Sequence, residues 1–171
     1  MPKLLPYDRE AAVRYAHTWA YRRNPAYYDF SPVGGDCTNF ASQCLFAGAG
    51  VMNFTPLYGW FYRSSGDRTP SWTGVPYLYD FLTRNLGPGP FAVETALSGL
   101  LPGDLVQLAF AREGGYRHTP VVVQVTEPNL TGILVAAHSN DADFRPLSTY
   151  PIRMLRCLHI EGVRSAEQPG S

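Results

Sequence analysis

Apolar residues in the first half of the chain recur at helical spacing. Between Asp8 and Arg23 they fall three and four positions apart, so they share one face of a predicted helix. Pro25 follows at once and ends that helix, because a proline disfavours helical backbone in the residue before it. We expect two further helices, over residues 37–46 and 75–84.

The second half of the chain changes to short segments rich in β-branched and apolar residues, separated by glycine, proline and asparagine. Four strands are expected, over residues 105–110, 118–125, 133–138 and 154–160. Helices first and an antiparallel sheet afterwards predict an α+β fold. We expect one domain over residues 1–163 and a loose polar tail over residues 164–171.

A long segment that is rich in aromatic residues separates the second and third predicted helices. Residues 51–73 include Tyr58, Trp60 and Trp72. A loop of this length in a compact domain is usually functional or disordered, and its aromatic content argues against disorder. Two interpretations stay open, namely one wall of a substrate cleft and a hydrophobic lid that covers the core.

Charge and cysteine content narrow the classes of function. Lys and Arg number 14, as do Asp and Glu, and no basic run occurs, so the composition argues against binding to nucleic acid. No apolar run is long enough to span a membrane. The three cysteines match no metal motif, so a zinc site is not expected. The polar N-terminus lacks the apolar region of a signal peptide, which predicts a cytoplasmic location; the alternative is export by another route or as part of a longer protein.

The most informative segment surrounds Cys37. Residues 34–35 are glycines, which permit a sharp turn before the helix, and Asp36 is a favourable N-cap residue. Cys37 then lies in the first helical turn, where unpaired N–H groups and the helix dipole favour a thiolate. We interpret Cys37 as a nucleophile, with a small buried core residue as the alternative. Cys44 and Cys157 are interpreted as core residues.

Histidines at the ends of two predicted strands supply a candidate base. His118 opens one strand and His138 closes the next, so antiparallel pairing brings both to one edge of the sheet. A Cys–His pair needs a third polar group to orient the imidazole, and His138, Asn140 and Asp141 are candidates. Spacing alone does not choose among them. The direction fixed by the strand favours His138, which we predict as the third catalytic residue; Asn140 and Asp141 are the alternatives, and the charge of Asp141 is the argument for the carboxylate.

Several segments of the chain together resemble the bacterial putative amidase domain family. The resemblance extends from about Tyr7 to Ile160, and its most specific part is Gly-Gly-Asp-Cys-Thr-Asn-Phe at residues 34–40. It implies a papain-like cysteine hydrolase, related to the CHAP and NlpC-type cell-wall enzymes, with a nucleophile helix packed on a small antiparallel sheet. It also implies that Cys37 is the nucleophile and His118 the base. Relatives carry His, Asn, Asp or Glu at the third position.

The expected activity is cysteine-dependent hydrolysis of an amide bond, in a peptide or a peptidoglycan stem peptide, through an acyl-enzyme. An acyl transferase that uses the same Cys–His site and a non-catalytic module that binds a glycan or peptide are the alternatives. No cofactor is implied by this chemistry. The residues expected to contact the substrate are Asp36, Asn39, Tyr58, Trp60 and Trp72.

Overall fold

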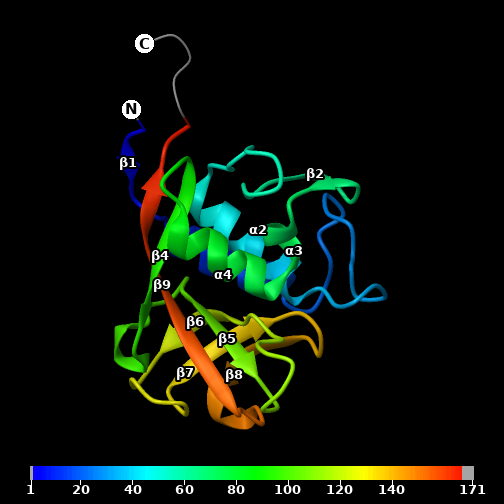
Figure 1. The fold of residues 1–171 in the computed structure, drawn as a ribbon. Coiled ribbons are helices and arrows are strands. Elements are labelled where there is room, and N and C mark those ends of the chain that lie inside the picture. The colour runs from blue at the N-terminus through cyan, green and yellow to red at the C-terminus, as the bar shows by residue number, and fades with distance from the viewer. Residues whose placement is uncertain (1, 167–171) are drawn as a thin grey trace.

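A computed structural model describes residues 2–166 of the chain. Its helices gather on one side of a curled antiparallel sheet (Figure 1). The α+β class predicted from the sequence is therefore confirmed. The helices are α1 (Arg9–Trp19), α2 (Cys37–Ala49), α3 (Pro70–Thr73) and α4 (Val75–Arg84), with short 3₁₀ helices η1 (Leu97–Gly99) and η2 (Leu147–Thr149).

The main sheet has seven strands. Its order is β1-β9-β5-β6-β7-β8, and β4 also pairs with the long strand β9. A small separate hairpin is formed by β2 (Tyr62–Ser64) and β3 (Asp67–Arg68). The main strands are β1 (Leu4–Leu5), β4 (Gly89–Thr95), β5 (Leu105–Ala109), β6 (Val121–Val125), β7 (Ile133–Ala137), β8 (Ala142–Pro146) and β9 (Met154–Arg164).

Four of these strands match predicted segments, and β1, β4 and β8 were not predicted. At the C-terminus, β9 continues to Arg164, so the first residue of the predicted tail belongs to the sheet. The rest of that prediction falls partly on residues 167–171, which lie outside the described part of the chain.

The helix ends differ from prediction for local physical reasons. The Asp8 carboxylate caps α1 by accepting from the Ala11 N–H at 3.0 Å. The helix stops at Trp19, four residues before the predicted end, where the Trp19 carbonyl bonds the side chain of His138 at 2.8 Å. Helix α2 instead runs three residues past its predicted end and closes at Gly50, whose left-handed φ of 68° suits a C-terminal glycine.

Buried side chains form a core on each face of the main sheet. Strand residues alternate between the two faces, as the pleat requires. On the helix-covered face, α2 contributes Cys44, and on the opposite face β9 contributes Cys157; both are free thiols and fully buried, which confirms their interpretation as core residues. Within residues 2–166, no helix is long and apolar enough to cross a membrane.

The aromatic segment folds over the core. Trp60 and Trp72 are completely buried, with ring centroids 4.7 Å apart. The Trp60 indole N–H donates to Ser42 Oγ at 3.1 Å, and that of Trp72 donates to Asn39 Oδ1 at 3.0 Å. Trp60 and Trp72 thus fit the second interpretation of residues 51–73, a hydrophobic lid that covers the core.

Candidate active site

The Asp36 carboxylate, directly before Cys37, bonds to side chains and to a loop N–H rather than to the backbone of the helix that it precedes. Asp36 makes no side-chain cap on α2, in contrast to the sequence prediction. Its Oδ1 accepts from the backbone N–H of Phe30 and from Asn39 Nδ2, each at 2.9 Å, and its Oδ2 lies 2.5 Å from His138 Nδ1. Asp36 therefore ties the loop before α2 to the end of β7.

Cys37 begins α2 and is only 9% exposed. Its Sγ lies 3.7 Å from Thr38 Oγ1 and 3.9 Å from the carbonyl oxygen of Arg117. Burial raises the pKa of the Cys37 thiol and outweighs the hydrogen bonds from Thr38 and Thr119 that lower it. The thiolate expected at this helix end is thus disfavoured in the resting site, because desolvation penalises the charged form.

His118 lies at the edge of the sheet that meets the start of α2. It forms a β-bridge with Leu108, at the end of β5. The residues on either side of it contact the first turn of α2: the Arg117 carbonyl faces Cys37, and Thr119 Oγ1 lies 3.3 Å from Thr38 Oγ1. Residues 117–119 therefore pack against the first turn of α2.

The His118 imidazole lies in a pocket of aromatic side chains. It is 6% exposed, and its ring centroid lies 5.5 Å from that of Tyr150 and 6.1 Å from that of Phe110. Burial, and then the charge of Arg145, lower the pKa of His118 to about 4. Both members of the candidate pair are therefore neutral at rest.

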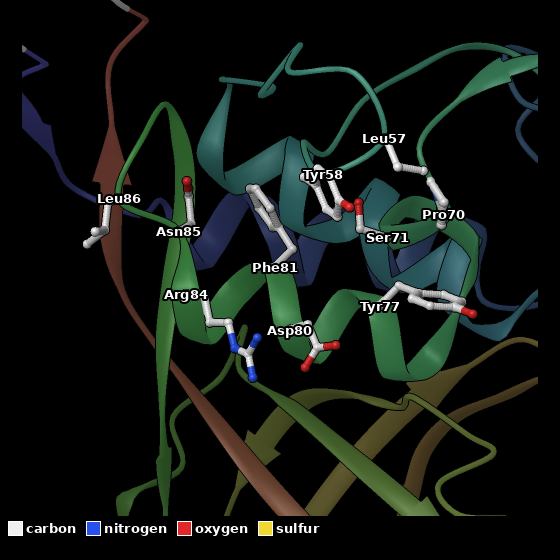
Figure 2. A pocket seen from close by; sticks show the side chains of 10 residues that line it. All are labelled: Leu57, Tyr58, Pro70, Ser71, Tyr77, Asp80, Phe81, Arg84, Asn85 and Leu86. Atoms are coloured by element: carbon white, nitrogen blue, oxygen red, sulfur yellow. The ribbon is translucent and has the colours of Figure 1, made fainter.

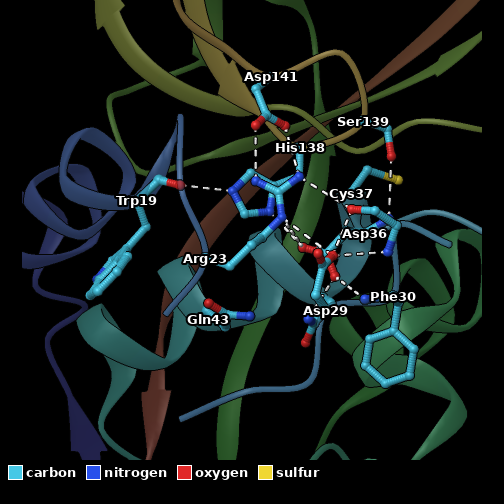
Figure 3. A network of polar contacts seen from close by, with 12 residues as sticks. Trp19, Arg23, Asp29, Phe30, Asp36, Cys37, Gln43, His138, Ser139 and Asp141 are labelled. Atoms are coloured by element: carbon cyan, nitrogen blue, oxygen red, sulfur yellow. Dashed lines mark hydrogen bonds and ion pairs between the residues drawn. The ribbon is translucent and has the colours of Figure 1, made fainter. Parts of the chain in front are cut away.

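His138 reaches the predicted edge of the sheet but is bound elsewhere. Antiparallel pairing of β6 with β7 brings His118 and His138 to the same end. Both His138 ring nitrogens have partners, Nδ1 with Asp36 and Nε2 with the Trp19 carbonyl (Figure 3). The His138 ring also stacks on Phe40, with the ring centroids 4.0 Å apart. Within the described residues no hydrogen bond joins it to His118, so the structure does not place it as the orienting group.

The other two candidates for the third position are also directed elsewhere. Asp141 forms two hydrogen bonds with the guanidinium of Arg23, at 2.9 and 3.0 Å, and the Arg23 Nε lies 3.7 Å from Asp36 Oδ2 (Figure 3). Asn140 is exposed, in a turn with a φ of 58°. The sequence predicted that Arg23 is the last residue of a helix. Because α1 ends at Trp19, Arg23 instead lies in the loop that follows, where it pairs with Asp141.

The five residues expected to contact substrate do not line one surface. Asp36 and Asn39 are buried and hydrogen-bonded to other protein groups, and Trp60 and Trp72 lie in the core. Tyr58 is 80% exposed.

Tyr58 borders a cavity of about 530 Å³ between the aromatic segment and α4, which includes Tyr77, Phe81 and Arg84 (Figure 2). Neither Cys37 nor His118 lines this cavity. The residues near His118 that the sequence missed are Arg145 and Tyr150; they flank the short helix η2, and no motif marks them.

Comparisons with known proteins find a family and a relative that match most of the chain. A family model described as "Putative amidase domain" matches residues 6–158. A protein of Bacillus subtilis (strain 168) named "Uncharacterized protein YhbB" is 38% identical over 143 residues, which cover 81% of this chain. The match spans 43% of the length of that relative. No solved structure matches the chain.

Proposed function

Because the chain belongs to the putative amidase domain family, we propose that it hydrolyses amide bonds with Cys37 as nucleophile and His118 as base. The family description supports amide hydrolysis, and the assignment to a cysteine is our own inference. We also propose a papain-like architecture related to the CHAP and NlpC-type enzymes. The helix that begins at Cys37 and the antiparallel sheet at His118 support this proposal.

The contact between the first turn of α2 and residues 117–119 carries this proposal. Cys37 faces the Arg117 carbonyl, and Thr38 meets Thr119, so His118 lies between two residues that pack against the nucleophile helix. The interpretation of Cys37 as a core residue explains its burial. It does not explain a histidine of strongly lowered pKa within the segment that packs against the first turn of α2, a pattern typical of functional sites.

The neutral resting pair suggests how the reaction begins. His118 accepts the thiol proton as Cys37 attacks the amide carbonyl, so the thiolate forms during attack rather than beforehand. Backbone N–H groups of the first turn of α2 have no helical acceptor and can stabilise the oxyanion. The His118 imidazolium then protonates the leaving amine, and water hydrolyses the Cys37 acyl-enzyme.

The substrate class that we propose is a peptide, including the stem peptide of peptidoglycan. Acyl transfer to an amine remains a second candidate on the same residues, because an enclosed acyl-enzyme reacts with whichever nucleophile reaches it. His118 is 6% exposed and Cys37 9%, which is the observation that favours keeping this candidate. Adding a primary amine to the assay distinguishes the two by the ratio of hydrolysed to transferred product.

Amine release from peptide and muropeptide libraries tests the function. We expect Cys37→Ser to abolish release, by 10²-fold or more. Cys157→Ser is the matched control, because Cys157 is a buried thiol on the opposite face of the sheet. Equal loss in both variants would indicate general damage, and full activity in Cys37→Ser would refute the proposed nucleophile.

A further inference from the structure

One buried hydroxyl beside the candidate site has no hydrogen-bond partner. Across residues 2–166, Tyr150 Oη is the single buried side-chain oxygen or nitrogen atom without one. An enclosed polar group that is not hydrogen-bonded destabilises a fold, and native proteins keep few of them. A group of this kind needs a physical explanation, and a role in catalysis is one.

The surroundings of Tyr150 hold its ring against His118. The two ring centroids are 5.5 Å apart, and Phe110 stacks on Tyr150 from 6.4 Å. The Arg145 guanidinium carbon lies 3.6 Å above the Tyr150 ring. Arg145 is itself fixed by two hydrogen bonds to Thr149, at 2.8 and 3.0 Å.

Electrostatics relate Tyr150 to the nucleophile as well. Burial raises the pKa of Tyr150, the charge and proximity of the Arg145 guanidinium lower it, and charge on Cys37 makes a smaller contribution that raises it. The hydroxyl is consequently protonated at neutral pH and lies within electrostatic range of the thiol.

His118 needs the kind of group that Tyr150 offers. No hydrogen bond to its imidazole occurs within residues 2–166, and the candidates His138 and Asp141 are bound to other groups. When the imidazole accepts the thiol proton it carries two N–H groups. One is directed to the reacting atoms, and the other needs an acceptor that fixes the ring.

We propose that Tyr150 is the positioning residue of the Cys37–His118 pair, its hydroxyl oxygen accepting the second N–H of the protonated imidazole. The inference rests on the proposed function. The bond requires the His118 imidazole to turn toward the Tyr150 hydroxyl, and catalytic hydrogen bonds in unliganded sites are often made only with substrate bound. Tyr150 keeps its own proton; the thiol proton moves to His118 and then to the leaving amine.

A neutral acceptor suits this position better than a carboxylate. Arg145 lies against the Tyr150 ring, so a carboxylate in that place would pair with the guanidinium instead of the imidazole. The phenol leaves His118 free to remain neutral at rest.

Tyr150→Phe tests the proposal, because it keeps the ring contacts and removes only the hydroxyl. Alkylation of Cys37 by iodoacetamide is followed from pH 5 to 10, together with the kcat and KM of hydrolysis and the melting temperature. Alkylation involves no oxyanion and no leaving amine, so it reports on the Cys37–His118 pair alone. Tyr79→Phe is the control, since Arg156 covers the Tyr79 ring at the same 3.6 Å.

We expect Tyr150→Phe to slow alkylation near neutral pH by about tenfold and to lower kcat with KM little changed. The melting temperature should hold or rise, because an unpaired buried hydroxyl has been removed. Tyr79→Phe should leave the alkylation profile unchanged.

Three results would overturn the proposal. The first is an alkylation profile and a kcat that both stay at the wild-type level in Tyr150→Phe. The second is a loss of hydrolysis with unchanged alkylation, which would make Tyr150 a substrate contact. The third is a melting temperature that falls by several degrees, which would make the hydroxyl structural. Failure of the proposed function is recognised separately, by full hydrolysis in Cys37→Ser.

Discussion

His138 Nδ1 lies 2.5 Å from Asp36 Oδ2, and both side chains are 1% exposed. Removing one partner of such a buried pair leaves the other without its hydrogen bond, which costs about 3–5 kcal/mol. We therefore expect His138→Ala to lower the free energy of unfolding by that amount, measured by urea denaturation.

Asp141→Ala serves as the comparison, because Asp141 and Arg23 are each about a quarter exposed. Its expected cost is about 1 kcal/mol or less. A His138→Ala protein of unchanged stability, with kcat reduced about 10²-fold, would instead restore His138 as the group that orients His118.

The low pKa of His118 predicts a loss of stability in acid. The unfolded side chain titrates near 6.5 and the folded one at about 4, so the unfolded state binds the proton more tightly. The contribution of His118 to the free energy of unfolding is complete above pH 6.5, falls as the pH drops from 6.5 to about 4, and is lost below about 4. Urea denaturation of the wild type and His118→Phe between pH 7 and pH 4 should show a shallower pH dependence in the variant. Parallel curves would contradict the lowered pKa.

The buried Cys37 thiol should ionise at unusually high pH. Its pKa is raised by burial, so thiolate absorbance in the ultraviolet should develop above the ordinary value of about 8.5. The difference between the wild type and Cys37→Ser isolates this thiol, and urea-unfolded protein gives the reference titration. A midpoint well below 8.5 would indicate a preformed thiolate–imidazolium pair, in disagreement with the neutral resting site.

The aromatic segment offers a prediction about stability. Trp72 is fully buried against Trp60, so Trp72→Ala should cost about 3–5 kcal/mol. Tyr58 is 80% exposed, and Tyr58→Ala should stay within about 0.5 kcal/mol of the wild type. Thermal denaturation of the two variants separates the outcomes. A stable Trp72→Ala protein with impaired hydrolysis would return Trp72 to the list of substrate contacts.

Local signals in the sequence were sufficient for much of the fold. Helix α4 has its predicted bounds because an apolar face, Pro76 in its first turn and a stop at Asn85 all agree. Strands β4 and β8 were missed since their stability comes from pairing: β4 lies along the long strand β9, and β8 pairs with β7 although most of its residues are not buried. The end of α1 depends on His138, which is distant in sequence.

The site divides in the same way. Cys37 has a local sequence signature. Antiparallel pairing of β6 with β7 predicts that His118 and His138 lie at the same edge of the sheet. The partners of His138 and the contact of Tyr150 with His118 depend on loop conformations, which no spacing rule specifies. The position of Arg145 near His118 could not be predicted for the same reason.

The central claim is that Cys37 forms an acyl-enzyme, and mass spectrometry of protein quenched in acid during turnover of an amide substrate tests it most directly. The account predicts that the peptide containing Cys37 gains the mass of the acyl half of the substrate while the free amine is released. This adduct should persist in Cys44→Ala, whose thiol is enclosed in the core, and be absent from Cys37→Ala. Amine release at the wild-type rate by Cys37→Ala, or an adduct on another residue, would contradict the claim.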